Sequence, residues 1–138
     1  MKTVFLDSSV LFTAVNSPTG GSAKLFTLPQ YQLITSPYVL TEVERNVRKK
    51  LLKHHLERFF LLVLKLKIIK QFPQDKIIKK AEKATVFKDA VILAEAKQSK
   101  ADTLVTLDRK HLLTKQAERY LAPAKIMTPK MLIDLLGI

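Results

Sequence analysis

Short apolar runs alternate with longer amphipathic segments along the 138 residues of the sequence. Runs with the composition and period of β-strands are found at residues 3–6, 32–35, 67–72, 103–107 and 125–127. The third run is ambiguous, because residues 64–68 also fit the end of a helix. The fifth is the shortest. The pattern therefore predicts four to five strands.

Segments with helical spacing of apolar residues fill the intervals between these runs. Two helix starts carry a hydroxyl residue followed by proline, at Ser36-Pro37 and at Thr128-Pro129, the pattern of an N-cap before the first helical position. We expect the first of these helices to reach about residue 50 and the second to end at residue 137. Further helices are predicted at residues 51–64, 75–83 and 86–97, and after Asp108.

Strands that alternate with helices, each apolar enough to be covered on both faces, predict an α/β fold with a mainly parallel sheet. A length of 138 residues is that of one domain, so we expect residues 1–138 to form a single unit.

Positive charge is concentrated in one part of the chain. Lys and Arg number 24 against 12 acids, a net charge of +12. Residues 45–80 contain twelve of these basic residues and only two acids, so this basic segment carries +10 and the rest of the chain +2. Such a concentration predicts a polyanionic partner, either nucleic acid, an acidic protein tail or anionic lipid, with a solvated helical face as the alternative.

Several classes of protein are disfavoured by what the sequence lacks. It has no cysteine, which excludes disulfides and fits the reducing cytoplasm where we expect the protein to act. No apolar run is long enough to span a bilayer, and the N-terminus lacks the apolar region of a signal peptide. His54 and His55 are neighbours and His111 is remote in sequence, so we expect no zinc site. With three glycines there is no phosphate-binding glycine loop.

Four acids follow the predicted strands. Asp7 and Asp108 come directly after the first and fourth strands, while Glu42 and Asp89 lie in the first two turns of helices. Each alone can be a helix cap or offset a helix dipole. Because ligands of parallel sheets bind at the carboxyl ends of the strands, we expect the four to converge there.

Carboxylates that converge repel one another unless a cation compensates their charge. Mg²⁺ prefers such oxygen ligands, activates water and neutralises a phosphodiester's developing charge. An acidic cluster beside a basic surface therefore indicates a nuclease, with acids holding the metal and lysines holding the nucleic-acid backbone.

Four segments resemble, in order and spacing, the motifs of PIN-domain nucleases: residues 6–11 (LDSSVL), 36–43 (SPYVLTEV), 89–96 (DAVILAEA) and 101–108 (ADTLVTLD). The resemblance spans residues 4 to about 113. It implies a three-layer α/β/α domain, a Mg²⁺- or Mn²⁺-dependent endonuclease acting mostly on RNA, and a quartet of metal-binding catalytic acids formed by Asp7, Glu42, Asp89 and Asp108. The single-domain size further resembles toxins of VapBC toxin–antitoxin pairs, which implies an antitoxin partner and a homodimer.

Two positions depart from the family pattern. Position 9 is Ser where many relatives have Asn, and position 107 is Leu where a small residue is common. We expect Ser9 and Thr106 to donate hydrogen bonds to the metal-binding acids, although Thr106 also fits an ordinary strand residue. Glu44 lies two positions from Glu42, a rotation of roughly 200° around a helix, so only one of them can face the cleft. The motif favours Glu42.

Arg45, Arg48 and Lys49 follow Glu42 within two turns and are predicted to contact RNA phosphates, with a solvated helix surface as the alternative. The apolar segment 59–64 is expected in the core, or in part as a surface for an antitoxin or a second subunit. The main alternative function is a catalytically idle PIN-like module that binds RNA or protein. A haloacid-dehalogenase phosphatase is disfavoured, because its second Asp would stand at position 9, which is Ser.

Overall fold

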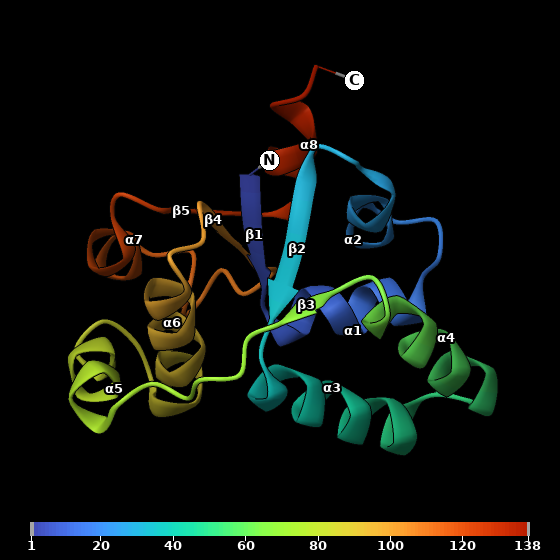
Figure 1. The fold of residues 1–138 in the computed structure, drawn as a ribbon, viewed down its shortest axis with the longest axis horizontal. Coiled ribbons are helices and arrows are strands. Elements are labelled where there is room, and N and C mark those ends of the chain that lie inside the picture. The colour runs from blue at the N-terminus through green and yellow to red at the C-terminus, as the bar shows by residue number, and fades with distance from the viewer. Residues whose placement is uncertain (1, 138) are drawn as a thin grey trace.

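Five parallel strands form one sheet in the order β3-β2-β1-β4-β5 (Figure 1). The computed structural model describes residues 2–137. Every pairing between the described strands is parallel, so the predicted α/β fold with a mainly parallel sheet is confirmed. The strands are β1 (Lys2–Leu6), β2 (Tyr31–Thr35), β3 (Lys67–Ile68), β4 (Thr103–Val105) and β5 (Lys125–Met127).

The third strand is shorter than the sequence predicted. Of residues 67–72, only Lys67–Ile68 pair with β2, and the Ile69 amide makes a last hydrogen bond to the Thr35 carbonyl at 2.9 Å. β3 lies at the sheet edge and has a neighbour on one side only. Its pairing therefore stops where β2 stops.

Helices flank the sheet on both sides, which gives the predicted three layers (Figure 1). One group contains α1 (Ser8–Asn16), α2 (Gly21–Lys24), α3 (Pro37–Lys50) and α4 (Lys53–Val63), together with a short 3₁₀ helix (Leu25–Thr27) and α8 (Pro129–Asp134), which contacts α2. The other group contains α5 (Asp75–Glu82), α6 (Phe87–Ser99) and α7 (Lys115–Leu121).

Both predicted cap-plus-proline starts are observed. The Ser36 hydroxyl accepts a hydrogen bond from the Val39 amide at 3.2 Å, and Thr128 caps α8 in the same way. Other helix bounds were less well predicted. The pattern gave no bounds for α1 and α2, and α8 ends at Asp134, three residues before the predicted end.

The centre of the core lies where β1 and β4 meet α6. Residues 4–6 of β1 and Leu104 and Val105 of β4 have no solvent exposure. Helix α6 is buried along eight consecutive residues, 89–96, because it packs on the sheet and also contacts α5 and α7. Asp89 and Glu95 belong to this stretch, so both acids are largely removed from solvent.

The register of β1 and β4 brings two predicted motifs together. Leu6 pairs with Val105, and the Asp7 amide donates to the Val105 carbonyl at 3.0 Å. The residues after both strands therefore meet at the carboxyl edge of the sheet. Helices α3 and α6 also begin near this edge (Figure 1).

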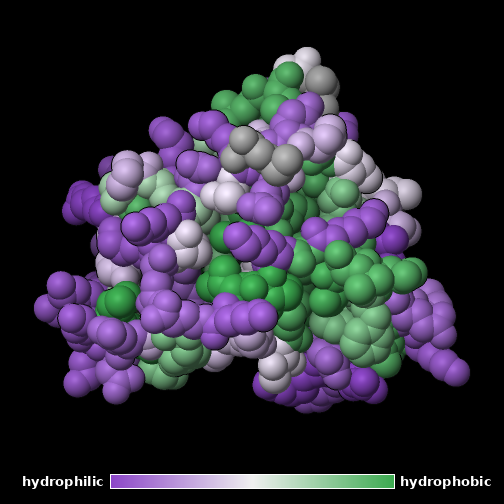
Figure 2. Space-filling model, in the orientation of Figure 1, coloured by the Kyte–Doolittle hydropathy of each residue, from purple (hydrophilic) through white to green (hydrophobic). Residues whose placement is uncertain are grey.

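Apolar side chains are exposed over β3 and α4 on the face that Figure 2 shows. Phe59 and Leu62 of α4 are buried, while Phe60, Leu61 and Leu64 are exposed. The segment 59–64 is thus partly core and partly surface. None of the helices within residues 2–137 combines the length and the apolarity of a membrane span.

Candidate functional site

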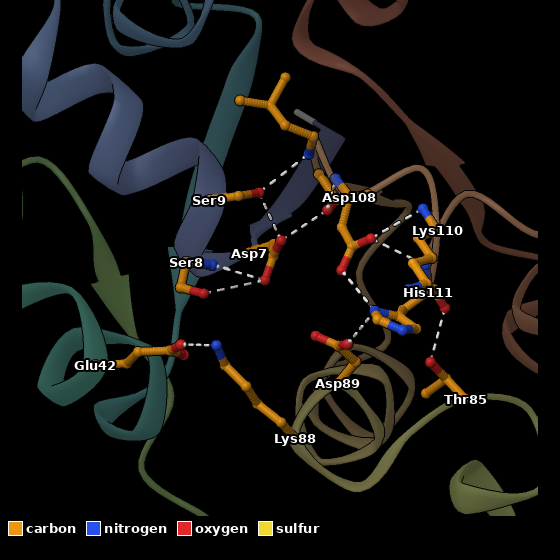
Figure 3. A network of polar contacts seen from close by, with 12 residues as sticks. Asp7, Ser8, Ser9, Glu42, Thr85, Lys88, Asp89, Asp108, Lys110 and His111 are labelled. Atoms are coloured by element: carbon orange, nitrogen blue, oxygen red, sulfur yellow. Dashed lines mark hydrogen bonds and ion pairs between the residues drawn. The ribbon is translucent and has the colours of Figure 1, made fainter. Parts of the chain in front are cut away.

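Asp7 is the most firmly held acid of the site. It lies at the N-cap of α1, where its Oδ1 accepts a hydrogen bond from the Ser8 amide at 2.8 Å. Its Oδ2 accepts from the hydroxyls of Ser9 and Thr106, both at 2.7 Å (Figure 3). Burial raises the pKa of Asp7, and these hydrogen bonds oppose the rise because they stabilise the charged form.

Ser9 and Thr106 each connect Asp7 to the loop after β4. The Ser9 hydroxyl accepts from the Leu107 amide at 3.1 Å, and the Thr106 hydroxyl accepts from the Asp108 amide at 3.0 Å. Each hydroxyl donates to Asp7 and accepts from the backbone, which fixes the direction of its proton. The geometry thus agrees with the supporting contact predicted for these two residues, and Ser9 fills its position without an amide side chain.

Glu42 lies in the second turn of α3 and is 9% exposed. Its Oε1 is 2.5 Å from the Lys88 ammonium, and this hydrogen bond raises the pKa of Lys88. Its Oε2 is buried and has no hydrogen-bond partner among the described residues. Glu44 instead pairs with Arg48 on the helix surface at 3.0 Å. The structure thus directs Glu42, and not Glu44, into the site.

Asp89 lies in the first turn of α6 and is 7% exposed. No hydrogen bond from residues 2–137 reaches its carboxylate, whose one ionic neighbour is the His111 ring at 3.4 Å. Burial, and then the nearby charge of Asp108, raises the pKa of Asp89 to about 6. Asp89 is therefore charged at a free-energy cost that a bound cation would reduce.

Asp108 and His111 form a turn after β4. Asp108 Oδ1 accepts hydrogen bonds from the amides of Lys110 and His111 at 3.0 and 2.9 Å, while its Oδ2 lies 3.5 Å from His111 Nδ1. The distance of His111 in sequence from the other histidines suggested that it stands alone. In the structure it instead lies beside two acids. The tertiary fold brings its ring between Asp108 and Asp89 (Figure 3).

The four predicted acids line one hollow of about 370 Å³ at the carboxyl edge of the sheet. Ser9, Lys50 and Lys88 share this lining. A second hollow of about 540 Å³ shares Glu42, Asn46 and Lys88 with the first and extends along α3 to Arg45, Tyr38 and Phe72. Together the two hollows form a groove with acids at one end and a basic, aromatic lining at the other.

Only part of the predicted basic set faces this groove. Arg45 lines it, whereas Arg48 and Lys49 line neither hollow. Lys50 and Lys88 do line it, and the sequence analysis did not single them out. Lys88 directly precedes Asp89 in the chain, but only the folded structure turns its side chain toward Glu42 on another helix.

One tight group could hold a metal ion. Within the part of the chain that the structure describes, ligand atoms of Asp89, Asp108 and His111 lie within 4.8 Å of one another. Asp7 and Glu42 line the same hollow but do not belong to this group. His111 was missed, although its position three residues after Asp108 was a signal that it could share a site with that acid.

A larger hollow, of about 950 Å³, lies at the opposite edge of the sheet. Its described lining is mostly apolar, with lysines at the rim and Asp102 as its one acid. The Asp102 carboxylate accepts hydrogen bonds from the amide and the hydroxyl of Thr3, and these bonds lower its pKa. Asp102 therefore has a structural role near the start of β1. The smaller hollow is therefore the better candidate for chemistry.

Comparisons with known proteins agree with this geometry. A family model described as PIN domain matches residues 3–110. A search of the curated proteins gave no match. Among solved structures, the chain is similar to Mycobacterium tuberculosis VapC20, a sarcin–ricin loop cleaving toxin, with a TM-score of 0.58 and 15% identity over 78% of this chain and 91% of that one.

Two further structures cover nearly the whole chain. PAE2754 from Pyrobaculum aerophilum has a TM-score of 0.65 and 17% identity over 99% of this chain and 97% of that one. VapBC2 from Rickettsia felis, bound to a DNA fragment from its promoter, has a TM-score of 0.64 and 20% identity over 91% and 96% of the two chains. At such identities the likeness is one of fold.

Proposed function

The chain belongs to the PIN-domain family, and on that premise we propose that it is a metal-dependent endoribonuclease. Its site is the hollow at the carboxyl edge of the sheet, and Mg²⁺ or Mn²⁺ is the cofactor. The reaction is hydrolysis of RNA phosphodiesters. Asp7, Glu42, Asp89 and Asp108 are the acids that hold the metal and serve catalysis.

The unpartnered Glu42 Oε2 is the observation that carries this proposal. A buried carboxylate oxygen without a hydrogen bond costs free energy, and this one has no partner among residues 2–137. It lines the same hollow as Asp89, whose carboxylate receives no hydrogen bond there either. Hard divalent cations take carboxylate oxygens of this kind, so the residues present fit the metal.

The metal, when bound, would activate a water and neutralise charge on the scissile phosphate. The protein's own residues do the positioning. Asp7 is fixed in one orientation by Ser8, Ser9 and Thr106. Lys88 has 63% of its side chain exposed at the hollow, and in this proposal it exchanges Glu42 for a substrate phosphate.

RNA is the proposed substrate because of the charge next to the acids. Lys50 and Arg45 line the groove, and the basic segment 45–80 carries +10. Basic side chains hold phosphates without regard to sequence, which suits a single strand crossing the site. The Mycobacterium tuberculosis neighbour is a toxin that cleaves the sarcin–ricin loop, and for this chain we propose cleavage of RNA.

We further propose that the protein is the toxin of a toxin–antitoxin pair, folded as a single domain over residues 1–138, dimeric and cytoplasmic. Several structures similar to it are VapBC complexes, from Haemophilus influenzae and Salmonella typhimurium among others. Phe60, Leu61 and Leu64 give α4 an exposed apolar surface on which a partner could be seated.

The test is cleavage of an end-labelled RNA pool with Mg²⁺, with Mn²⁺ and with EDTA. We expect metal-dependent cleavage that falls roughly 1000-fold or more in Asp7→Asn, because the neutral amide cannot replace a carboxylate at the metal. Asp134→Asn is the matched control, since within residues 2–137 this exposed acid of α8 forms an ion pair only with Lys130. RNA that is bound but uncut by the wild-type protein in every lane would instead support the idle binding module.

A further inference from the structure

We propose that His111 is a nitrogen ligand of the metal and selects a first-row transition ion, such as Mn²⁺, over Mg²⁺. The proposal rests on the metal site of the proposed function and adds a residue to it. Imidazole is a good ligand for first-row transition ions. Mn²⁺ also takes oxygen ligands, but it accepts a nitrogen more readily than Mg²⁺, which prefers oxygen atoms and water. A mixed set of one nitrogen and two carboxylates would therefore shift the preference of the site.

The first argument is the spacing of the ligand atoms. His111 Nδ1 lies 3.4 Å from Asp89 Oδ2 and 3.5 Å from Asp108 Oδ2. Hydrogen bonds between nitrogen and oxygen are shorter, at about 2.7–3.2 Å. Atoms that share one ion at about 2.1 Å lie roughly 3.0–3.4 Å apart, depending on the coordination angle. The observed spacing is therefore closer to that of a shared ion than to that of hydrogen bonds.

The second argument is the position of the ring between two acids. A protonated imidazole has a single N–H at Nδ1, and this N–H can point well at only one acceptor. In the structure Nδ1 is almost equally far from both carboxylates (Figure 3). A lone pair directed at an ion between Asp89 and Asp108 satisfies both, whereas a simple ion pair would draw the ring to one of them.

The third argument is that the backbone of His111 is fixed without using its ring. Its amide donates to Asp108 Oδ1, and its carbonyl accepts from the Thr85 hydroxyl at 2.8 Å. Asp108 uses Oδ1 for the turn and keeps Oδ2 for the site. The turn therefore holds one oxygen of Asp108 and the ring of His111 together at the hollow, as a preformed ligand pair requires.

The experiment is pulsed electron paramagnetic resonance on the full chain loaded with Mn²⁺. We expect echo modulation from a nitrogen bound to Mn²⁺, which changes from a ¹⁴N to a ¹⁵N pattern when the protein carries ¹⁵N-histidine. The modulation should vanish in His111→Asn and persist in His54→Asn, an exposed histidine of α4. In calorimetric titrations, His111→Asn should weaken Mn²⁺ binding by about 10-fold or more and Mg²⁺ binding by much less.

Absence of the nitrogen signal in wild-type protein that has bound Mn²⁺ would overturn the proposal. So would a signal that His111→Asn retains, or a failure to bind Mn²⁺ at all. The labelled wild-type protein shows whether any histidine nitrogen binds the ion, so a missing signal overturns the proposal whether or not the variant folds. RNA cleavage is measured separately. Cleavage without the nitrogen signal would refute His111 as a ligand but not the nuclease function, and the signal without cleavage would refute the nuclease function but not the ligand.

Discussion

Asp7 and Asp89 line the same hollow, yet their surroundings differ. Asp7 receives hydrogen bonds from a backbone amide and from three hydroxyls, which hold its carboxylate in one orientation. Asp89 receives none from residues 2–137 and faces only His111, with Asp108 and Asp7 adding to its charge repulsion. Burial raises the pKa of both acids, but only at Asp7 do hydrogen bonds oppose the rise.

This difference indicates two roles within one site. An acid already satisfied by the protein gains little from a cation in free energy and contributes mainly geometry. An acid without partners gains most when a cation binds, because the cation replaces the missing interactions. Asp7, with its donors Ser8, Ser9 and Thr106, is thus the preorganised part of the site. Asp89 lies in the part where binding of a cation stabilises the protein.

On the side of the site without hydrogen bonds from residues 2–137, the largest effect is expected from removing the charge of Asp89. Asp89→Asn should lower metal-dependent RNA cleavage by roughly 1000-fold. Without metal at pH 8, the same change should raise the free energy of unfolding by about 1 kcal/mol, because it removes the cost of burying a charged carboxylate and the repulsion from Asp108 and Asp7. Urea unfolding with EDTA measures the second effect. A variant that is less stable without metal would contradict the view that Asp89 lacks compensation.

A second effect concerns Glu95, a buried acid behind the site. Its Oε1 accepts from the Ser36 hydroxyl at 2.6 Å, the same hydroxyl that caps α3, and burial raises its pKa to about 7. The folded protein therefore holds a proton that the unfolded chain releases near pH 4.5, so stability should fall between about pH 4.5 and 7.

Glu95→Gln should remove that part of the pH dependence, of order 2–3 kcal/mol, because an amide does not titrate. Unfolding free energies of wild-type and Glu95→Gln proteins at pH 5 and pH 8 measure it. The variant should gain stability relative to the wild type as the pH rises. If the difference in unfolding free energy between the two proteins is the same at pH 5 and pH 8, Glu95 does not hold a proton in the folded state.

The smallest expected effect tests the hydrogen bonds that hold Asp7. Thr106→Val removes a fully buried hydroxyl that binds both Asp7 and the Asp108 amide, and should cost about 1–2 kcal/mol of stability. Thr103→Val is the matched control, a buried threonine of β4 for which residues 2–137 offer no side-chain hydrogen bond. If both variants lose the same stability in thermal unfolding, the hydrogen bonds of Thr106 to Asp7 and Asp108 do not stabilise the protein.

Local patterns in the sequence predicted the parts of the fold that depend on nearby residues. The strand runs and the caps at Ser36 and Thr128 follow from spacing within one element. Spacing also showed that only one of Glu42 and Glu44 can face the site, and the resemblance to the family motif favoured Glu42. Those patterns also predicted that the four acids meet at one edge, because parallel strands end on the same side of a sheet. They failed for the length of β3, since pairing at an edge depends on the neighbouring strand.

The sequence by itself thus determined the fold class, the family and the edge at which the acids gather. Only the tertiary structure decided which side chains compensate them. Thr106 reaches Asp7 across 99 positions, Lys88 reaches Glu42 from another helix, and His111 turns toward Asp89. Such contacts depend on strand order and helix packing, and neither leaves a periodic signal in the sequence, because residues distant in the chain meet only once the core has formed.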